Sequence, residues 1–319
     1  MTTDQSNSSL GELRRQRTPA AVQPLADALD APRKTFTTRA GQRLAYYADG
    51  PASGAPLVLI HSINAAPSSY EMKPLFDHCR AQRPVYSLDL PGFGQSERPA
   101  GPYTPDLFAD AISDFLTQVV AQPAAVVALS LSAEFAARAA AAVPDLVASL
   151  VLISPTGFSR RPLPSAAVAR GVHRVLTTPG LSQWLYGLVA SRPSIRFFLN
   201  KSFTTKAPDD LIDYAYATSH QPGARHAPLY FLSTQLFTPQ AADRLYTALR
   251  DLPVLVIADR DPYVDFAGLP DFVAAHRNWR HETLAPHLGL PHWEHPATTR
   301  AVLDRFWKRP TGPEGTMVD

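Results

Sequence analysis

Ser130 stands where an apolar run ends and an alanine-rich run begins, in the stretch AAVVALSLSAEFAARAA. This pattern predicts a strand that turns sharply into a helix, with the serine on the turn. So tight a turn requires small residues two positions before and after the serine, and Ala128 and Ser132 meet that requirement. The N-terminus of the helix would stabilise an oxyanion developing nearby. We therefore expect Ser130 to be a nucleophile; the alternative is a serine that only caps the helix.

A second group of reactive side chains lies near the C-terminus, where HLGLPHWEHP, residues 287–296, holds three histidines. A serine hydroxyl is a weak nucleophile unless a neighbouring base takes its proton. In the common arrangement one imidazole nitrogen reaches the serine oxygen and the other reaches a carboxylate. His287, His292 and His295 are therefore the candidates for the base, and the elements on which they lie must decide among them.

The elements that position these residues are predicted to be strands alternating with helices. Apolar runs occur in PLVLIHS, PVYSLDL, AAVVALS, LVASLVLIS and LPVLVIAD, and helical patterns span 67–79, 106–121, 131–143 and 297–307. This alternation predicts an α/β fold with a doubly wound, mostly parallel sheet. Near the N-terminus, KTFTTRAGQRLAYYADG predicts an antiparallel strand pair joined at Gly41. Open parallel sheets bind ligands at the carboxyl ends of their strands, which is where Ser130 is expected.

The pattern divides the chain into four parts. Residues 1–33 are polar and rich in proline and alanine, which predicts a mobile N-terminal arm. The α/β core is expected over 34–155 and 251–308. Between these two segments, 156–250 shows only helical patterns interrupted by prolines, and we expect an inserted helical cap. Residues 309–319 are expected to be a C-terminal tail.

The order of the motifs resembles the α/β-hydrolase superfamily, specifically its capped, esterase-like serine hydrolases, over about residues 34–308 apart from the cap. LIHSINAAPSSY resembles the His-Gly oxyanion loop with Ser62 in place of the glycine, and DLPGFGQSERP resembles the Asp-x-Pro-Gly-x-Gly-x-Ser loop. ALSLS takes the place of the nucleophile elbow, and VIADRDPYV looks like the acid-bearing loop after the seventh strand. The resemblance implies Asp261 as the triad acid. It also implies the backbone N–H groups of Ile63 and Leu131 as the oxyanion hole.

Several residues of these motifs have alternative, purely structural roles. Asp261 could instead cap the turn before Pro262. His61 is expected to be a buried histidine that bonds the oxyanion loop, and Asp89 and Ser96 are expected to hold their own loop together.

The catalytic histidine implied by the resemblance is missing from its usual place. Aligning LGLPHWEHP with the family's Gly-His-x-Pro-His-x-Glu-x-Pro segment puts Gly289 where the base is expected. His292 and His295 fall at or inside the start of the final helix and are expected to point away from Ser130. His287 lies two residues upstream in a loop, where a shift of this size is geometrically possible. We therefore predict His287 as the base, and a site without a functioning triad is the open alternative.

The function implied by the resemblance is a serine hydrolase that cleaves a small apolar ester or related acyl compound through an acyl-enzyme on Ser130. The cap holds many aromatic residues, including Trp184, Phe198, Tyr214 and Phe231, so we expect an apolar pocket for a small apolar molecule. Dehalogenase activity is disfavoured. The resemblance implies an Asp nucleophile for that activity in this fold, whereas this chain has Ser130 at the nucleophile position. Without a base, the protein would act as a lyase, isomerase or cyclase, or as a ligand-binding protein.

The composition limits the expected partners. Thirty Lys and Arg against 28 Asp and Glu give a net charge of +2 with no long basic run, so we expect neither a nucleic acid nor a membrane partner. The sequence lacks the apolar stretches of a membrane span or signal peptide. Its single cysteine, Cys79, fits a reducing compartment, and we expect a cytoplasmic location. No metal-ligand set or nucleotide-binding loop occurs, so no cofactor is expected. The sequence does not indicate an oligomeric state.

Overall fold

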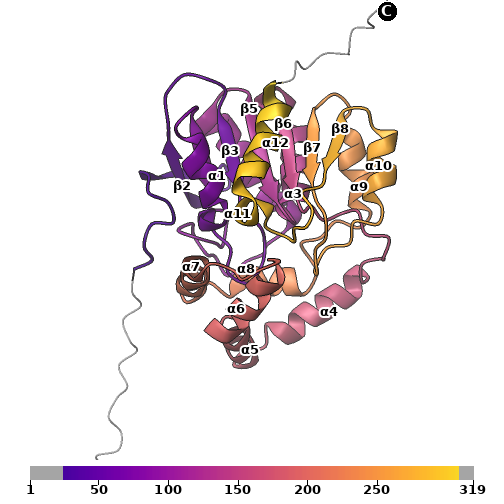
Figure 1. The fold of residues 1–319 in the computed structure, drawn as a ribbon. Coiled ribbons are helices and arrows are strands. Elements are labelled where there is room, and N and C mark those ends of the chain that lie inside the picture. Colours follow the sequence, from indigo (N-terminus) through magenta and orange to yellow (C-terminus); the bar gives the residue numbers. More distant parts are fainter. Residues whose placement is uncertain (1–23, 309–319) are drawn as a thin grey trace, which may run out of the picture.

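The computed structural model describes residues 24–308, which fold around one eight-stranded sheet (Figure 1). Its order is β1-β2-β4-β3-β5-β6-β7-β8. The strands are β1 (Arg33–Thr37), β2 (Arg43–Asp49), β3 (Leu57–Ile60), β4 (Val85–Leu88), β5 (Ala124–Leu129), β6 (Val147–Ile153), β7 (Val254–Ile257) and β8 (Trp279–Glu282). Strand β2 is antiparallel to both of its neighbours, and the other pairs are parallel. The predicted mostly parallel sheet, with an antiparallel pair at one edge, is confirmed.

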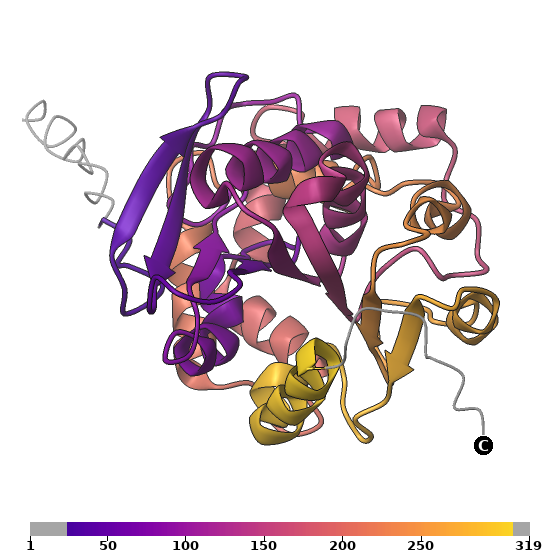
Figure 2. The ribbon, with the colours of Figure 1, turned by 90° about the horizontal axis from the view of Figure 1, so that it is seen from above.

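Helices cover both faces of the sheet (Figure 2). One face packs against α1 (Lys73–Cys79) and α12 (Pro296–Lys308), and the other packs against α2 (Pro105–Phe115) and α3 (Ser132–Ala142). Further along the chain, α10 (Leu269–Ala275) joins the second face. Shorter helical segments are η1 (Ser69–Met72), η2 (Leu116–Val120), η3 (Pro144–Leu146) and α11 (Pro291–Glu294). This doubly wound arrangement explains why the central strands are apolar throughout.

Side-chain alternation along the strands produces two separate cores. In β3, Val58 and Ile60 pack on the face that holds Phe108, whereas Leu57 and Leu59 pack on the face that holds Phe76. Successive residues of a strand point to opposite faces, so both sets are buried only because helices lie on both sides. In the pairing, Ile60 lies opposite Leu88 and Ala128. The carboxyl ends of these strands therefore meet at one edge of the sheet.

The helical insertion between β6 and β7 lies over this carboxyl edge (Figure 1). It comprises α4 (Ala166–Leu176), α5 (Leu181–Val189), α6 (Arg192–Lys201), α7 (Asp209–Ser219), α8 (His226–Leu232), α9 (Ala241–Arg244) and η4 (Tyr246–Ala248). Helices α4 to α8 form the cap. Tyr246 and Leu249, at the end of the insertion, pack in the core that contains α2 and α3. The segment predicted as cap over 156–250 thus returns to the core before residue 250.

The last residues of the predicted N-terminal arm, 1–33, contact the core. Ala28 and Leu29 are buried, and the Ala28 N–H donates to Tyr47 Oη over 2.9 Å. Tyr214 Oη of the cap donates to the Ala26 carbonyl over 2.8 Å. Residues 1–23 of the arm and the predicted tail 309–319 lie outside the described residues.

Candidate active site

Ser130 lies on the predicted turn between β5 and α3. Its φ is 55°, in the left-handed region that residues other than glycine rarely adopt. The Ser130 N–H donates to the Ile153 carbonyl over 2.9 Å, and its own carbonyl accepts from the Ala133 N–H over 3.1 Å. These bonds to β6 and α3 hold the residue in its strained conformation. Its hydroxyl makes no hydrogen bond within residues 24–308 and lines a cavity.

The cavity has a volume of about 370 Å³ and lies between the carboxyl edge of the sheet and the cap. Most of its lining is apolar, as expected from the sequence, and the cap residues Phe198, Tyr214 and Phe231 contribute to it. Trp184, another aromatic residue of the cap, is exposed on the surface instead. Ionisable groups are few in the lining, and the carboxylates among them are Glu71 and Asp261. The site therefore suits an uncharged, apolar ligand.

His61 holds the oxyanion loop in place. Its Nε2 accepts from the Leu90 N–H over 3.0 Å, and its Nδ1 donates to the Ser62 carbonyl over 2.6 Å. The Ser132 hydroxyl donates to the His61 carbonyl over 2.6 Å, which ties the loop to the start of α3. With both ring nitrogens engaged, His61 has the structural role that the sequence suggested.

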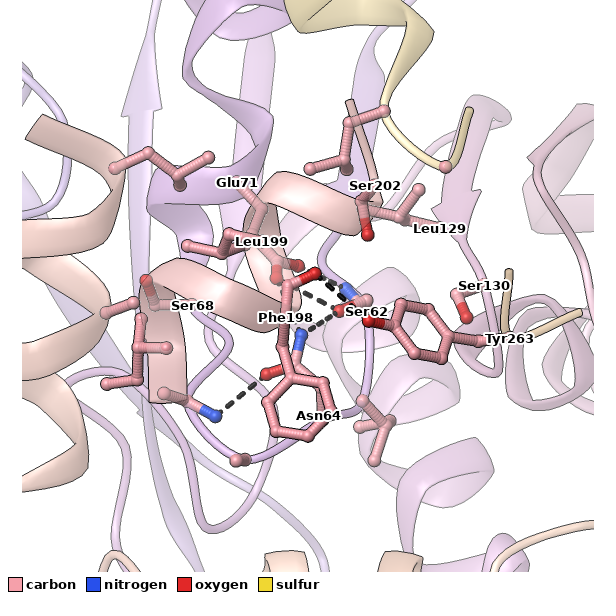
Figure 3. Close-up of a pocket in the computed structure, with 18 of the residues that line it drawn as sticks. Ser62, Asn64, Ser68, Glu71, Leu129, Ser130, Phe198, Leu199, Ser202 and Tyr263 are labelled. Atoms are coloured by element: carbon pink, nitrogen blue, oxygen red, sulfur yellow. Dashed lines mark hydrogen bonds between the residues drawn. The ribbon is translucent and has the colours of Figure 1, made fainter. Parts of the chain in front are cut away.

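Glu71 is a site residue that the sequence did not reveal. Its buried carboxylate accepts from the Ser62 N–H over 2.8 Å, the Ser62 hydroxyl over 3.0 Å and the Asn64 side-chain amide over 2.9 Å (Figure 3). Its carbonyl accepts from Trp293 Nε1 over 2.7 Å. The one signal in the sequence was Ser62 itself, because a buried polar side chain in place of the family's glycine needs a partner.

Two backbone donors next to Ser130 are free. The N–H groups of Ile63 and Leu131 donate no hydrogen bond within the described chain, in contrast to the Ser62 N–H that Glu71 accepts. Ile63 lines the same cavity as Ser130, and Leu131 follows Ser130 at the N-terminus of α3. Free N–H groups at a helix N-terminus are suited to bind negative charge on an oxygen.

Asp261 also lines the cavity, in the loop after β7. Its Oδ1 accepts from the Tyr263 N–H over 2.7 Å and from the Val264 N–H over 3.1 Å, and its Oδ2 accepts from no described residue. Burial raises the pKa of Asp261 to about 6, against the opposing effect of these two hydrogen bonds. Asp261 is therefore a carboxylate with one free oxygen and an affinity for protons near neutral pH.

Gly289 lies against Asp261. A Cβ at this position would lie 2.8 Å from Asp261 Oδ2, so the carboxylate oxygen occupies space that a side chain would need. The Gly289 carbonyl accepts from the Ser154 hydroxyl over 3.1 Å, which ties the loop to the end of β6. Gly289 also lines the cavity, and its alignment with the family's catalytic histidine stays a prediction.

The three C-terminal histidines, His287, His292 and His295, do not line the cavity that contains Ser130. His287 is buried; its Nδ1 bonds to the Leu288 carbonyl, and its Nε2 has no partner. Burial lowers its pKa. His292 Nε2 donates to the Glu71 carbonyl over 2.8 Å, and burial lowers the His292 pKa to about 4. His295 Nε2 bonds to the Pro286 carbonyl over 2.8 Å. The assignment of His287 as the base stays a prediction.

Metal and thiol chemistry have little support in residues 24–308. No group of three or more His, Cys, Asp or Glu in that range is arranged to hold a metal ion. No helix in that range is both long and apolar enough to cross a bilayer. Cys79 is buried, and burial raises the pKa of its thiol to about 11. Asp89 and Ser96 hold their loop as expected, with the Ser96 hydroxyl donating to the Asp89 carbonyl over 2.6 Å.

The chain is similar to known proteins in sequence and in fold. The chain is 27% identical over 231 residues to human (lyso)-N-acylphosphatidylethanolamine lipase, which covers 66% of each chain. It is 29% identical over 115 residues to rat 1-acylglycerol-3-phosphate O-acyltransferase ABHD5, which covers 35% of this chain and 32% of that protein. Its fold is similar to an enol-lactonase from Burkholderia xenovorans, with a TM-score of 0.67 and 16% identity over 86% of this chain and all of that one.

The aligned part thus spans less than two thirds of both relatives' lengths. The model of the alpha/beta hydrolase family, in contrast, matches residues 57–302, from β3 into α12. That range includes Ser130, the cap and Asp261. The chain belongs to the α/β hydrolase family.

Proposed function

We propose that the protein is a serine hydrolase that cleaves an apolar ester or related acyl compound through an acyl-enzyme on Ser130. One observation carries the proposal: Ser130 projects from a strained turn into a mostly apolar cavity, beside the free N–H groups of Ile63 and Leu131. When Ser130 Oγ attacks the acyl carbon, the carbonyl oxygen becomes negative, and these two N–H groups would stabilise it. The human relative is a lipase, which agrees with this substrate class.

The base in this proposal is Asp261 rather than an imidazole. Asp261 lines the same cavity as Ser130, its Oδ2 is free, and a pKa of about 6 leaves it ionised at neutral pH yet basic enough to accept a proton. Asp261 takes the proton of the Ser130 hydroxyl, directly or through one water molecule, as the bond from Oγ to the acyl carbon forms. It then gives that proton to the leaving alkoxide, and the alcohol departs.

Deacylation repeats these steps with water. Asp261 takes a proton from a water molecule as that water attacks the acyl carbon. The proton then passes to Ser130 Oγ as the acyl bond breaks, which releases the acid and restores the free serine. His287 is the competing assignment for the base, and it would require the loop at 287–290 to turn its imidazole toward Ser130.

A fluorophosphonate probe and a series of p-nitrophenyl esters test the nucleophile. We expect the wild-type protein to be labelled at Ser130 and to hydrolyse the esters, and Ser130→Ala to lose both. Ser202→Ala is the matched control for the site of labelling, because Ser202 also lines the cavity, and this variant is expected to retain labelling. An unlabelled wild-type protein, or labelling of another residue, would contradict the proposal.

A second candidate function follows if Gly289 occupies the family's base position, because the site then has no imidazole there. In this alternative the cavity binds an apolar ligand without hydrolysing it, or supports lyase, isomerase or cyclase chemistry. A fluorescent fatty-alcohol analogue, which is apolar and uncharged, distinguishes the two candidates. Saturable binding of the analogue, together with no fluorophosphonate labelling and no ester turnover, would favour the non-hydrolytic function.

A further inference from the structure

Exposed apolar side chains concentrate on the cap. Ten large apolar residues are exposed among residues 24–308, and nine of them lie between Leu163 and Leu232. Trp184 of α5 is 62% exposed and Val175 of α4 is 60% exposed. In Figure 1, α4 and α5 lie on the side of the cap that faces away from the sheet. Scattered exposed apolar residues are ordinary in proteins, but a cluster of them on one face marks a surface that binds something.

Helix α4 leaves its apolar face uncovered. Ala169 is its one buried residue. Val168, Val172 and Val175 are spaced four and three residues apart, so they share one face of the helix, and all three are exposed. Arg170 lies on the opposite side. An amphipathic helix that exposes both its apolar and its cationic faces is typical of a segment that lies in the interface of a membrane.

The exposed apolar surface reaches the mouth of the active-site cavity. Phe198, Leu232 and Tyr263 each line that cavity and are each exposed at the surface. A ligand that leaves an apolar phase at these three residues would therefore meet apolar side chains at the entrance of the cavity that contains Ser130.

The stretch that contains α4, α5 and α6 is strongly positive, although the whole chain is nearly neutral. Residues 146–208 contain eight Lys and Arg and no Asp or Glu. Three of these cations, Arg160, Arg192 and Arg196, form ion pairs with Asp271, Asp213 and Asp209. The other five make no ion pair within the described chain: Arg161, Arg170, Arg174, Lys201 and Lys206. This stretch therefore has unpaired positive charge and exposed apolar side chains together.

We propose that the face of the cap formed by α4, α5 and α6 docks on an anionic lipid surface, with the cavity mouth toward the lipid. Valine and tryptophan side chains would enter the interfacial region while the unpaired Arg and Lys bind anionic headgroups. A second copy of the chain fits less well, because contact through the same face would bring unpaired cations together. The expectation of no membrane partner came from the total charge of the chain, whereas the cap differs from that average.

Vesicle flotation of the full chain tests this docking surface. We expect binding to phosphatidylcholine vesicles that contain phosphatidylglycerol, weaker binding to phosphatidylcholine alone, and a decrease as salt is added. Arg170→Glu with Arg174→Glu should lower the partition coefficient at least about tenfold, since each cation near an anionic surface contributes roughly fivefold. Arg277→Glu with Arg280→Glu is the matched control, because both residues are exposed near the start of β8, at the edge of the sheet opposite the cap.

The apolar contribution is tested by Val172→Asp with Val175→Asp. Both side chains are exposed, so we expect the fold to persist by circular dichroism and vesicle binding to be lost. Trp184 provides an independent signal: its fluorescence should shift to the blue on anionic vesicles, and Trp184→Phe should remove that shift. Ser130→Ala must bind as well as the wild type, so failure of the catalytic proposal would leave this result unchanged.

Three outcomes would overturn the docking proposal. The first is a wild-type protein that does not float with anionic vesicles. The second is an equal loss of binding in the cap pair and the control pair of charge reversals, which would indicate attraction by total charge alone. The third is a dimer, detected by light scattering without lipid, that Val172→Asp with Val175→Asp dissociates while vesicle binding is absent. That last result would identify the face as an interface between copies.

Discussion

The candidate active site has a nucleophile side, formed by Ser130 and the oxyanion loop, and a base side, formed by Asp261 and Gly289. The two sides differ in how many hydrogen bonds hold them in place. On the nucleophile side, Ser130 is fixed by bonds to β6 and α3, and Ser62 of the oxyanion loop is held through its N–H and hydroxyl by Glu71. On the base side, Gly289 has no side chain, and Asp261 has a free Oδ2. One side is a hydrogen-bonded network, and the other is a carboxylate that lies against a glycine.

The difference follows from what each side must do. Stabilising an oxyanion requires donors fixed within a few tenths of an ångström, because the charge develops at one point and the donors must already be there. Moving a proton requires only an acceptor of suitable pKa within reach, and a water molecule can extend that reach. A site of this kind can therefore work without an imidazole, provided that burial has raised the pKa of a carboxylate within reach of the serine.

The largest expected effect is on the base side. Asp261→Asn should lower kcat/KM for p-nitrophenyl esters by a factor of about 10² to 10⁴, the usual contribution of a general base. Asparagine keeps the Oδ1 that accepts from Tyr263 and Val264, so the loop should stay in place. His287→Ala should change kcat/KM by less than about threefold. If His287→Ala instead abolishes turnover as completely as Ser130→Ala, the base is His287, because members of one catalytic unit are non-additive.

A smaller effect is expected on the nucleophile side. Glu71→Ala would leave the buried Ser62 N–H without an acceptor, and we expect a loss of about 2–4 kcal/mol in the free energy of unfolding measured in urea. The rate of fluorophosphonate labelling should fall as well, because the loop that holds the Ile63 donor loosens. Glu71→Gln is the graded control, since it keeps one acceptor oxygen and should lose less. A Glu71→Ala protein with unchanged stability and labelling would show that the network does not brace the loop.

The pH dependence of stability probes Asp261 without any substrate. Its folded-state pKa of about 6 lies above the ordinary value of 3.8, so the charged form is disfavoured by folding. The group therefore costs stability at high pH, and that cost disappears as pH falls through about 6 toward 4. Asp261→Asn should raise the free energy of unfolding by up to about 2–3 kcal/mol at pH 8 and by almost nothing at pH 4. Equal effects at both pH values would mean that burial does not perturb this carboxylate.

Local patterns in the sequence were sufficient for the fold and for the nucleophile turn. The turn at Ser130 depends on its immediate neighbours, namely an apolar strand before it, an alanine-rich helix after it and small residues at 128 and 132. The apolar runs predicted the central strands for the same reason, since burial on both faces leaves a continuous signal.

The hydrogen-bonded network and the cap surface depend on contacts between distant segments, and the sequence did not reveal them. Glu71 meets Ser62 only after η1 folds back over the oxyanion loop, and its carbonyl meets Trp293 from the other end of the chain. On the cap, the aromatic residues suggested a pocket lining, but Trp184 and Phe197 turned out to be exposed. Which side of a short helix faces the core is decided by packing against other elements, and no single helix encodes it.

The smallest expected change comes from Gly289, which lies against Asp261 Oδ2. Gly289→Ala places a Cβ 2.8 Å from Asp261 Oδ2, which is too close for the two atoms to pack, so the carboxylate must rotate. Because this oxygen accepts no hydrogen bond within residues 24–308, we expect a loss of less than about 1 kcal/mol in stability. Ester hydrolysis should fall only a few-fold, since Oδ1 stays bonded to the Tyr263 and Val264 N–H groups while the base moves slightly.

Gly289→His is the companion variant to Gly289→Ala. Both displace Asp261 Oδ2, but only the histidine supplies an imidazole that could act as the base. If Asp261 then orients that imidazole toward Ser130, hydrolysis should exceed that of Gly289→Ala and reach or pass the wild-type rate. The double variant Gly289→His with Asp261→Asn should fall again, because the imidazole loses the carboxylate that orients it. Equal activity of the Ala and His variants at residue 289 would mean that a side chain there cannot reach Ser130. In that case the base position inferred from the family would not apply to this chain.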